Sequence, residues 1–163
     1  MRKAVTTFVV AILIVIGISV AVDVSITTDR EEVLEILRAA EDAVAGADAR
    51  KFESLISKDF HTPKIGKKEL MAAAKPAMAE GGPIFIKIVD YKIEVDGNSA
   101  IAEVVVRING FGIADGSRGA QKDTKWRVDL KRASDGAPWL ISGLKLVDAG
   151  DVKIDPILRN LFE

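Results

Sequence analysis

The pattern of apolar and polar residues divides the chain into a first half with helical spacing and a second half with alternating spacing. Apolar residues recur every three or four positions over 29–45, in the short stretch after Asp48, and over 67–80, which predicts three helices. Gly46 is expected to end the first helix and Asp48 to cap the second. Pro76 is expected to kink or shorten the third.

Beyond these helices, strict alternation of apolar and polar residues predicts strands. The expected strands lie at 84–95, 99–108, 124–133 and 139–147. Gly97 and Asn98 allow a tight hairpin turn between the first two. Within the first strand, the alternation predicts that Phe85, Val89 and Tyr91 face the apolar interior. Helices followed by consecutive hairpins define an α+β fold, with an antiparallel sheet and its helices on one face.

Residues 1–22 stand apart because they are almost entirely apolar after Arg2 and Lys3. This segment fits a signal peptide, since small residues precede a cut after Ala21. It also fits a membrane anchor, since the 19 residues of 4–22 would form a helix of about 28 Å. Both interpretations predict export: a periplasmic, a secreted or an outward-facing membrane-anchored protein.

The chain is therefore expected to contain four segments. They are the signal peptide or membrane anchor at 1–22, a linker at 23–28, one domain at 29–150, and a tail with a short helix at 151–163. If the first segment is not cleaved, it connects the domain to a membrane.

Composition excludes several classes of function. The 163 residues include 23 Lys and Arg, 24 Asp and Glu, one His and no Cys. The near-zero net charge argues against a nucleic-acid partner. The lack of cysteine excludes disulfides and thiolate chemistry. No group of His, Asp and Glu has ligand spacing, so neither a metal nor a cofactor is expected.

The order of elements resembles that of the NTF2-like superfamily, also described as SnoaL-like or cystatin-related. The segment from Leu55 to Phe60 is similar to the end of that family's opening helix pair, and the region around Trp126 and Trp139 is similar to its last two strands. The resemblance covers nearly all of 29–150. It implies a cone in which three N-terminal helices pack on a curved antiparallel four-stranded sheet, with a pocket at one end. The fold hosts enzymes, binding domains and oligomerisation modules, so it does not define a function.

Candidate chemistry is sparse. In the steroid-isomerase-like branch of this superfamily, the general base is an Asp that precedes a Pro, and Thr62 occupies the matching position. Threonine cannot act as a base near neutral pH. The neighbouring His61 is a weak catalytic candidate, because imidazole can transfer protons in this range. The residues predicted to line a ligand pocket are His61, Tyr91, Trp126 and Trp139.

Charge is distributed unevenly between the two halves, with a net charge of −4 over 29–59 and +4 over 107–132. Basic residues on the expected outer face of the sheet form a predicted interface for a second copy of the chain, an acidic partner or anionic headgroups. They are Arg107, Lys125, Arg127 and Lys131.

Two functions remain as hypotheses. The first is an exported, non-enzymatic module that binds a small apolar ligand or assembles with other proteins. The alternative is a small isomerase, dehydratase or hydrolase that uses His61 and Tyr91 in a cone pocket.

Overall fold

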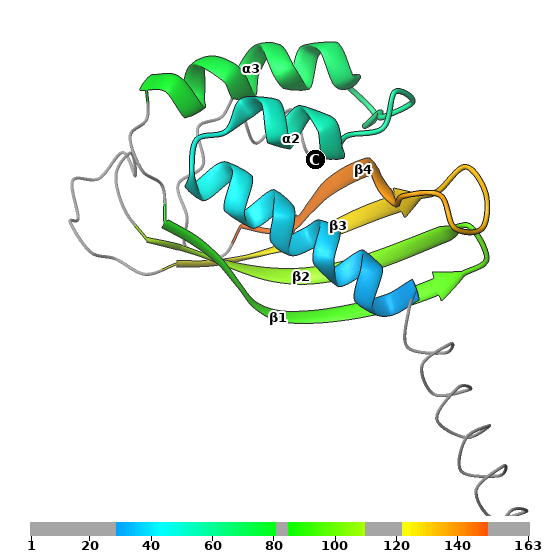
Figure 1. Ribbon diagram of the computed structural model, residues 1–163. Helices are drawn as coiled ribbons and strands as arrows, with labels where there is room; N and C mark the ends of the chain where they lie inside the picture. Colours follow the sequence, from blue (N-terminus) through cyan, green and yellow to red (C-terminus); the bar gives the residue numbers. More distant parts are fainter. Residues whose placement is uncertain (1–28, 81–84, 110–121, 150–163) are drawn as a thin grey trace, which may run out of the picture.

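The computed structural model describes residues 29–80, 85–109 and 122–149 (Figure 1). It begins with a helix over 29–45, which is followed by two further helices and a sheet. The helices are α2 (Ala49–Leu55) and α3 (Lys67–Glu80), and the strands are β1 (Phe85–Asp96), β2 (Ser99–Asn109), β3 (Lys122–Lys131) and β4 (Leu140–Asp148). The expected export segment, linker and C-terminal helix lie outside the described residues. No helix within the described ranges is long and apolar enough to cross a membrane.

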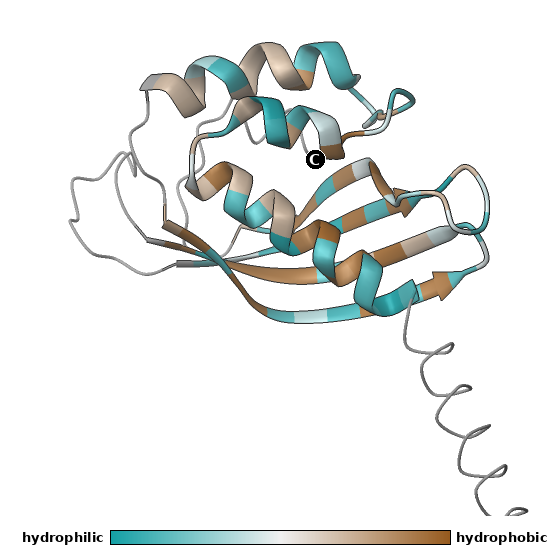
Figure 2. Cartoon of the chain, viewed as in Figure 1, coloured by the Kyte–Doolittle hydropathy of each residue, from teal (hydrophilic) through white to brown (hydrophobic). Residues whose placement is uncertain are grey.

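The four strands form one antiparallel sheet in the order β1-β2-β3-β4. All three helices lie on the same side of this curved sheet (Figure 1). Apolar bands alternate with polar ones along the strands (Figure 2), as a sheet with one covered face requires. The predicted α+β class and the predicted two-layer arrangement are confirmed.

The core fills the space between the helices and the inner face of the sheet. Its most completely buried large side chains are Val33 from the first helix, Leu130 from β3 and Trp139 just before β4. Burial of a side chain of this size contributes roughly 1.5–3 kcal/mol. The strongest contributions to the core therefore come from segments that are far apart in the sequence.

The first helix ends at residue 45, as predicted, but the residue in the left-handed conformation after it is Ala47 and not Gly46. The N–H of Gly46 still donates to the carbonyl oxygen of Asp42 at 2.8 Å, and the left-handed residue is Ala47, with φ 54°. Asp48 caps α2, since its side chain accepts from the N–H of Lys51 at 2.9 Å. Pro76 lies inside α3, which continues to Glu80.

A β-bulge interrupts the alternation in β1. Ile88 lies opposite Val106, whereas Asp90 lies opposite Val105, so Val89 is an extra residue in the strand. Because side chains in a strand alternate between faces, one extra residue exchanges the faces of all residues on one side of the bulge.

The predicted orientation of Phe85 and Val89 was wrong for this reason. Phe85 is 68% exposed and Val89 is 38% exposed. The inward positions before the bulge belong to Ile86 and Ile88, which line the space beneath the helices. After the bulge, Tyr91 lies on the inner face but at the edge of the sheet, where 47% of its surface remains exposed.

Candidate functional site

A cavity of about 260 Å³ lies between the helices and the inner face of the sheet. A dry apolar cavity of about 150 Å³ is enough to hold benzene, and drug-sized ligands occupy pockets that begin near 300 Å³. The cavity therefore has room for a small ring with a short substituent. Its described lining residues come from all parts of the fold and are Leu37, Ala40, Glu41, Val44, Phe52, Ile56, Phe60, Leu70, Ile86, Ile88, Val104, Val106, Ile108, Trp126, Val128, Ile141 and Leu144.

Glu41 is the one charged residue among these lining residues. Its Oε2 accepts a hydrogen bond from the backbone N–H of Ile88 at 2.7 Å, next to the bulge in β1. Its other oxygen, Oε1, has no hydrogen-bond or ion-pair partner among the described residues. The cavity thus carries a single carboxylate that is held by one oxygen.

Sequence reasoning missed Glu41, although a signal was present. Glu41 follows Leu37 by four positions, and it therefore lies on the same face of the helix as the apolar residues Val33 and Leu37. A carboxylate on an apolar helix face is unusual, because burial of a charge without a partner is costly.

Trp126 lines the cavity from β3. Its Nε1 donates to the hydroxyl of Thr124 at 2.9 Å, and that hydroxyl donates to the carbonyl oxygen of Val106 at 3.2 Å. Because Thr124 is fully buried, this chain of hydrogen bonds fixes the indole against the cavity wall.

Trp139 is a core residue rather than a lining residue. It is 1% exposed, and the guanidinium of Arg132 lies 4.7 Å from the centroid of its ring. Its buried Nε1 has no hydrogen-bond partner within the described ranges.

His61 lies on the surface beside β4. Its backbone N–H donates to the carbonyl oxygen of Ser142 at 3.2 Å, and its Nδ1 lies 3.3 Å from the carbonyl oxygen of Asp59. The adjacent Thr62 is buried, and its hydroxyl accepts from the N–H of Ile65 at 3.1 Å, which stabilises the local turn. Neither side chain lines the cavity.

Tyr91 lies at the opposite edge of the sheet, on β1. It borders a surface groove together with Leu34, Arg38 and Glu41 of the first helix. The sheet order separates β1 from β4 by two strands, so His61 and Tyr91 do not share a site.

The four basic interface candidates all lie on the outer face of the sheet. Arg107 forms two hydrogen bonds with Asp123, at 2.8 and 3.0 Å, and these bonds lower the pKa of that carboxyl. Arg127 pairs with Asp129 at 3.1 Å, and Lys125 and Lys131 are exposed. The face is therefore a mixture of acidic and basic groups rather than a continuous basic surface.

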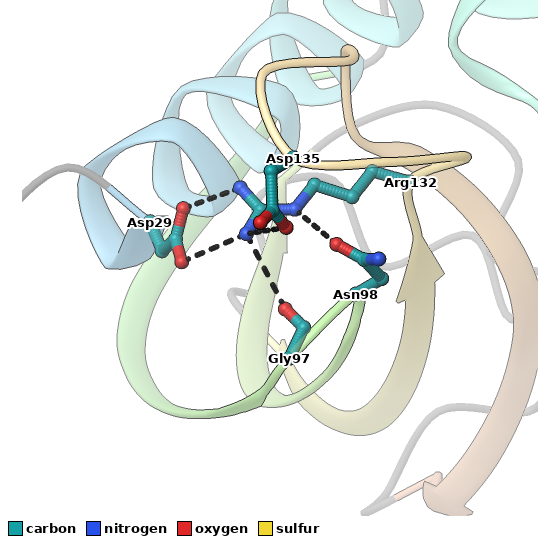
Figure 3. A network of polar contacts seen from close by, with 5 residues as sticks. All are labelled: Asp29, Gly97, Asn98, Arg132 and Asp135. Atoms are coloured by element: carbon teal, nitrogen blue, oxygen red, sulfur yellow. Dashed lines mark hydrogen bonds and ion pairs between the residues drawn. The ribbon is translucent and has the colours of Figure 1, made fainter.

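Arg132 was also missed by sequence reasoning, although it joins more segments than any candidate above. Its guanidinium donates to Asp29, Asn98, Asp135 and the carbonyl oxygen of Gly97 (Figure 3). No periodic pattern links positions so far apart in the chain. Within the described part of the chain, no group of three or more His, Asp and Glu residues could hold a metal ion.

No protein-family model and no curated protein sequence matches the chain. Solved structures do match it. An NTF2-like protein of unknown function from Pseudomonas putida KT2440 is 17% identical with a TM-score of 0.62, over 80% of this chain and 98% of that one. A proposed dehydratase of the NTF2-like family from Streptomyces avermitilis is 17% identical with a TM-score of 0.56, over 72% of this chain and 94% of that one.

Bd1075 from Bdellovibrio bacteriovorus is 13% identical with a TM-score of 0.61, over 73% of this chain. The match spans only 41% of the length of Bd1075. These similarities, together with the helices and the four-stranded sheet described above, show that the chain has the NTF2-like fold, the cone that its pattern of elements implies. At such low identity they show the fold alone.

Proposed function

We propose that this chain is an exported, non-enzymatic binding module that takes a small apolar ligand in the cavity between its helices and its sheet. The observation that carries the proposal is a cavity of about 260 Å³ in which every described lining residue except Glu41 is apolar. Transfer of apolar surface from water into such a space is favourable by about 25 cal/mol per Å². An apolar cavity of this kind has little affinity for water and binds apolar molecules.

The position of the candidate catalytic residues supports binding over catalysis. An isomerase or dehydratase needs an acid and a base that reach the same substrate. His61 and Tyr91 lie at opposite edges of the sheet, and neither lines the cavity. Within the cavity, Glu41 is the one titratable side chain among the described lining residues, and Tyr91 borders the neighbouring groove instead.

Binding of ethylbenzene tests the proposal, because its size suits the cavity and it has no polar group. The protein is isolated from cells that express the full chain, and binding is measured by calorimetry and by thermal unfolding. A ligand at a hundredfold excess over its Kd stabilises the folded state by about 2.7 kcal/mol, so the Tm is expected to rise.

A matched pair of variants locates the binding site. Ala40→Leu places extra atoms inside the cavity and should weaken ethylbenzene binding, whereas Ala39→Leu makes the same change at a position outside it. The proposal is wrong if the wild-type protein does not bind ethylbenzene, or if both variants bind it equally well.

Export rests on the apolar stretch that follows Arg2 and Lys3. Intact mass of the protein from the cell envelope distinguishes cleavage after Ala21 from an uncleaved anchor.

We also propose that the outer sheet face, with Arg107, Lys125, Arg127 and Lys131, joins two copies of the chain. The alternation of acidic and basic groups on this face supports self-association, because a two-fold interface needs a surface that complements itself.

A further inference from the structure

The carboxylate of Glu41 occupies a boundary between two spaces. On one side is the apolar cavity, and on the other is a surface groove of about 250 Å³ between the first helix and β1. Arg38, Asp42 and Lys87 also border this groove, but no ion pair joins any of them to Glu41. Among the described side chains, none therefore forms an ion pair with Glu41.

The bulge in β1 fixes the position of this carboxylate. Oε2 is held by the N–H of Ile88 at 2.7 Å, a bond that leaves Oε1 without a partner among the described residues. Oε1 is not among the buried polar atoms that lack a partner, so it lies where solvent or a ligand can reach it, at the boundary between the cavity and the groove. A ligand that places a donor there can replace water at this oxygen.

From this arrangement we infer that the cavity selects an amphiphilic amine, an apolar molecule with one protonated nitrogen that donates to Oε1 of Glu41. The inference rests on the proposed function, since the apolar part of the ligand occupies the same cavity. A protonated amine is the donor that a carboxylate binds most strongly, because charge-assisted hydrogen bonds are about twice as strong as neutral ones. An anionic ligand of the same shape is repelled by Glu41.

The experiment compares three molecules of one shape: ethylbenzene, which is neutral, phenethylamine, which is cationic, and phenylacetate, which is anionic. Their affinities are measured by calorimetry for the wild-type protein, for Glu41→Gln and for Glu35→Gln. Glu35 is an exposed carboxylate on the same helix and does not line the cavity, so its variant is a control for the change in net charge. The glutamine at position 41 keeps a carbonyl oxygen that can accept from Ile88, which preserves the local fold.

Glu41→Gln should weaken phenethylamine binding about tenfold, the loss expected for one charge-assisted hydrogen bond, and leave ethylbenzene binding within about twofold of wild type. Glu35→Gln should bind both as the wild-type protein does, and phenylacetate should bind wild-type protein most weakly of the three.

Three other outcomes overturn the inference in distinguishable ways. If ethylbenzene binds, but phenethylamine binds the wild-type protein and Glu41→Gln equally well, the inferred selectivity for amines is wrong. The cavity then remains a site for apolar ligands. If Glu41→Gln loses affinity for ethylbenzene as well, Glu41 has a structural role only. If the wild-type protein binds neither ethylbenzene nor phenethylamine, the proposed function fails together with the inference.

Discussion

The guanidinium of Arg132 binds both carboxylate oxygens of Asp29, at 2.5 and 3.1 Å, across 103 residues of sequence. Its Nε also donates to the side chain of Asn98 at 2.8 Å (Figure 3). The face of the guanidinium lies over the ring of Trp139. One side chain therefore connects the start of the first helix, the turn between β1 and β2, and the segment that enters β4.

Arg132→Leu should lower the free energy of unfolding by about 2 kcal/mol, because it removes the charge-assisted hydrogen bonds that join Arg132 to Asp29 and Asn98. The Arg132 side chain is only 9% exposed, so solvent cannot replace its hydrogen bonds well. Urea denaturation measures the effect.

Arg127→Leu is the matched control for this change. Arg127 is 45% exposed and has one ion pair, with Asp129, so its loss should cost less than about 1 kcal/mol. Similar losses for the two variants would contradict the structural role assigned to Arg132.

Ala47→Gly should stabilise the protein by up to about 1 kcal/mol. Ala47 is the one non-glycine residue with a positive φ, 54°, within the described ranges, and a residue with a Cβ is strained in that conformation. Glycine is the usual residue at this position after a helix. Thermal unfolding measures the change in Tm.

The same substitution inside the helix should have the opposite sign. Ala39→Gly lies in the middle of the first helix, where glycine costs about 1 kcal/mol relative to alanine. If Ala47→Gly destabilises as much as Ala39→Gly, the left-handed conformation at Ala47 is wrong.

The fold could be predicted from the sequence because regular periodicity decides it. The helix at 67–80 and the turn at Gly97 and Asn98 were both predicted correctly, since each depends on neighbours a few positions away. The alternation of Trp126 and Val128 likewise placed them on the inner face.

The candidate site was less predictable because it depends on interruptions of that periodicity. The extra residue Val89 moved Phe85 to the outside and Ile88 to the inside, and it placed the N–H of Ile88 beside Glu41. No single-sequence pattern reports a bulge or its partner 47 residues away. Of the predicted pocket residues, Trp126 alone lines the cavity.

Arg107→Gln should raise the pKa of Asp123 toward its ordinary value of 3.8. In the wild-type protein, hydrogen bonds from Arg107 hold this pKa below that value. A lowered carboxyl pKa stabilises the fold above pH 3.8, and this stabilisation is lost as the pH falls through the lowered pKa. Carboxyl chemical shifts followed by NMR over an acid titration measure the change.

Arg127→Gln serves as the control for this titration, because Arg127 pairs with Asp129 and not with Asp123. The pKa of Asp123 should stay low in that variant. An equal rise in both variants would mean that the net charge of the sheet, rather than the Arg107 hydrogen bonds, determines the pKa.

The proposed dimer predicts that reversal of charge on the outer sheet face separates the two copies. Arg127→Glu combined with Lys131→Glu would place acidic groups beside Glu103 and Asp129, so a self-complementary surface becomes repulsive. Sedimentation equilibrium should then give the mass of one chain instead of two. Arg50→Glu combined with Lys68→Glu makes the same charge change at exposed positions on α2 and α3, and this variant should remain dimeric. A wild-type protein that sediments as a monomer, or a reversed variant that keeps the dimer mass, would show that this face is not the interface.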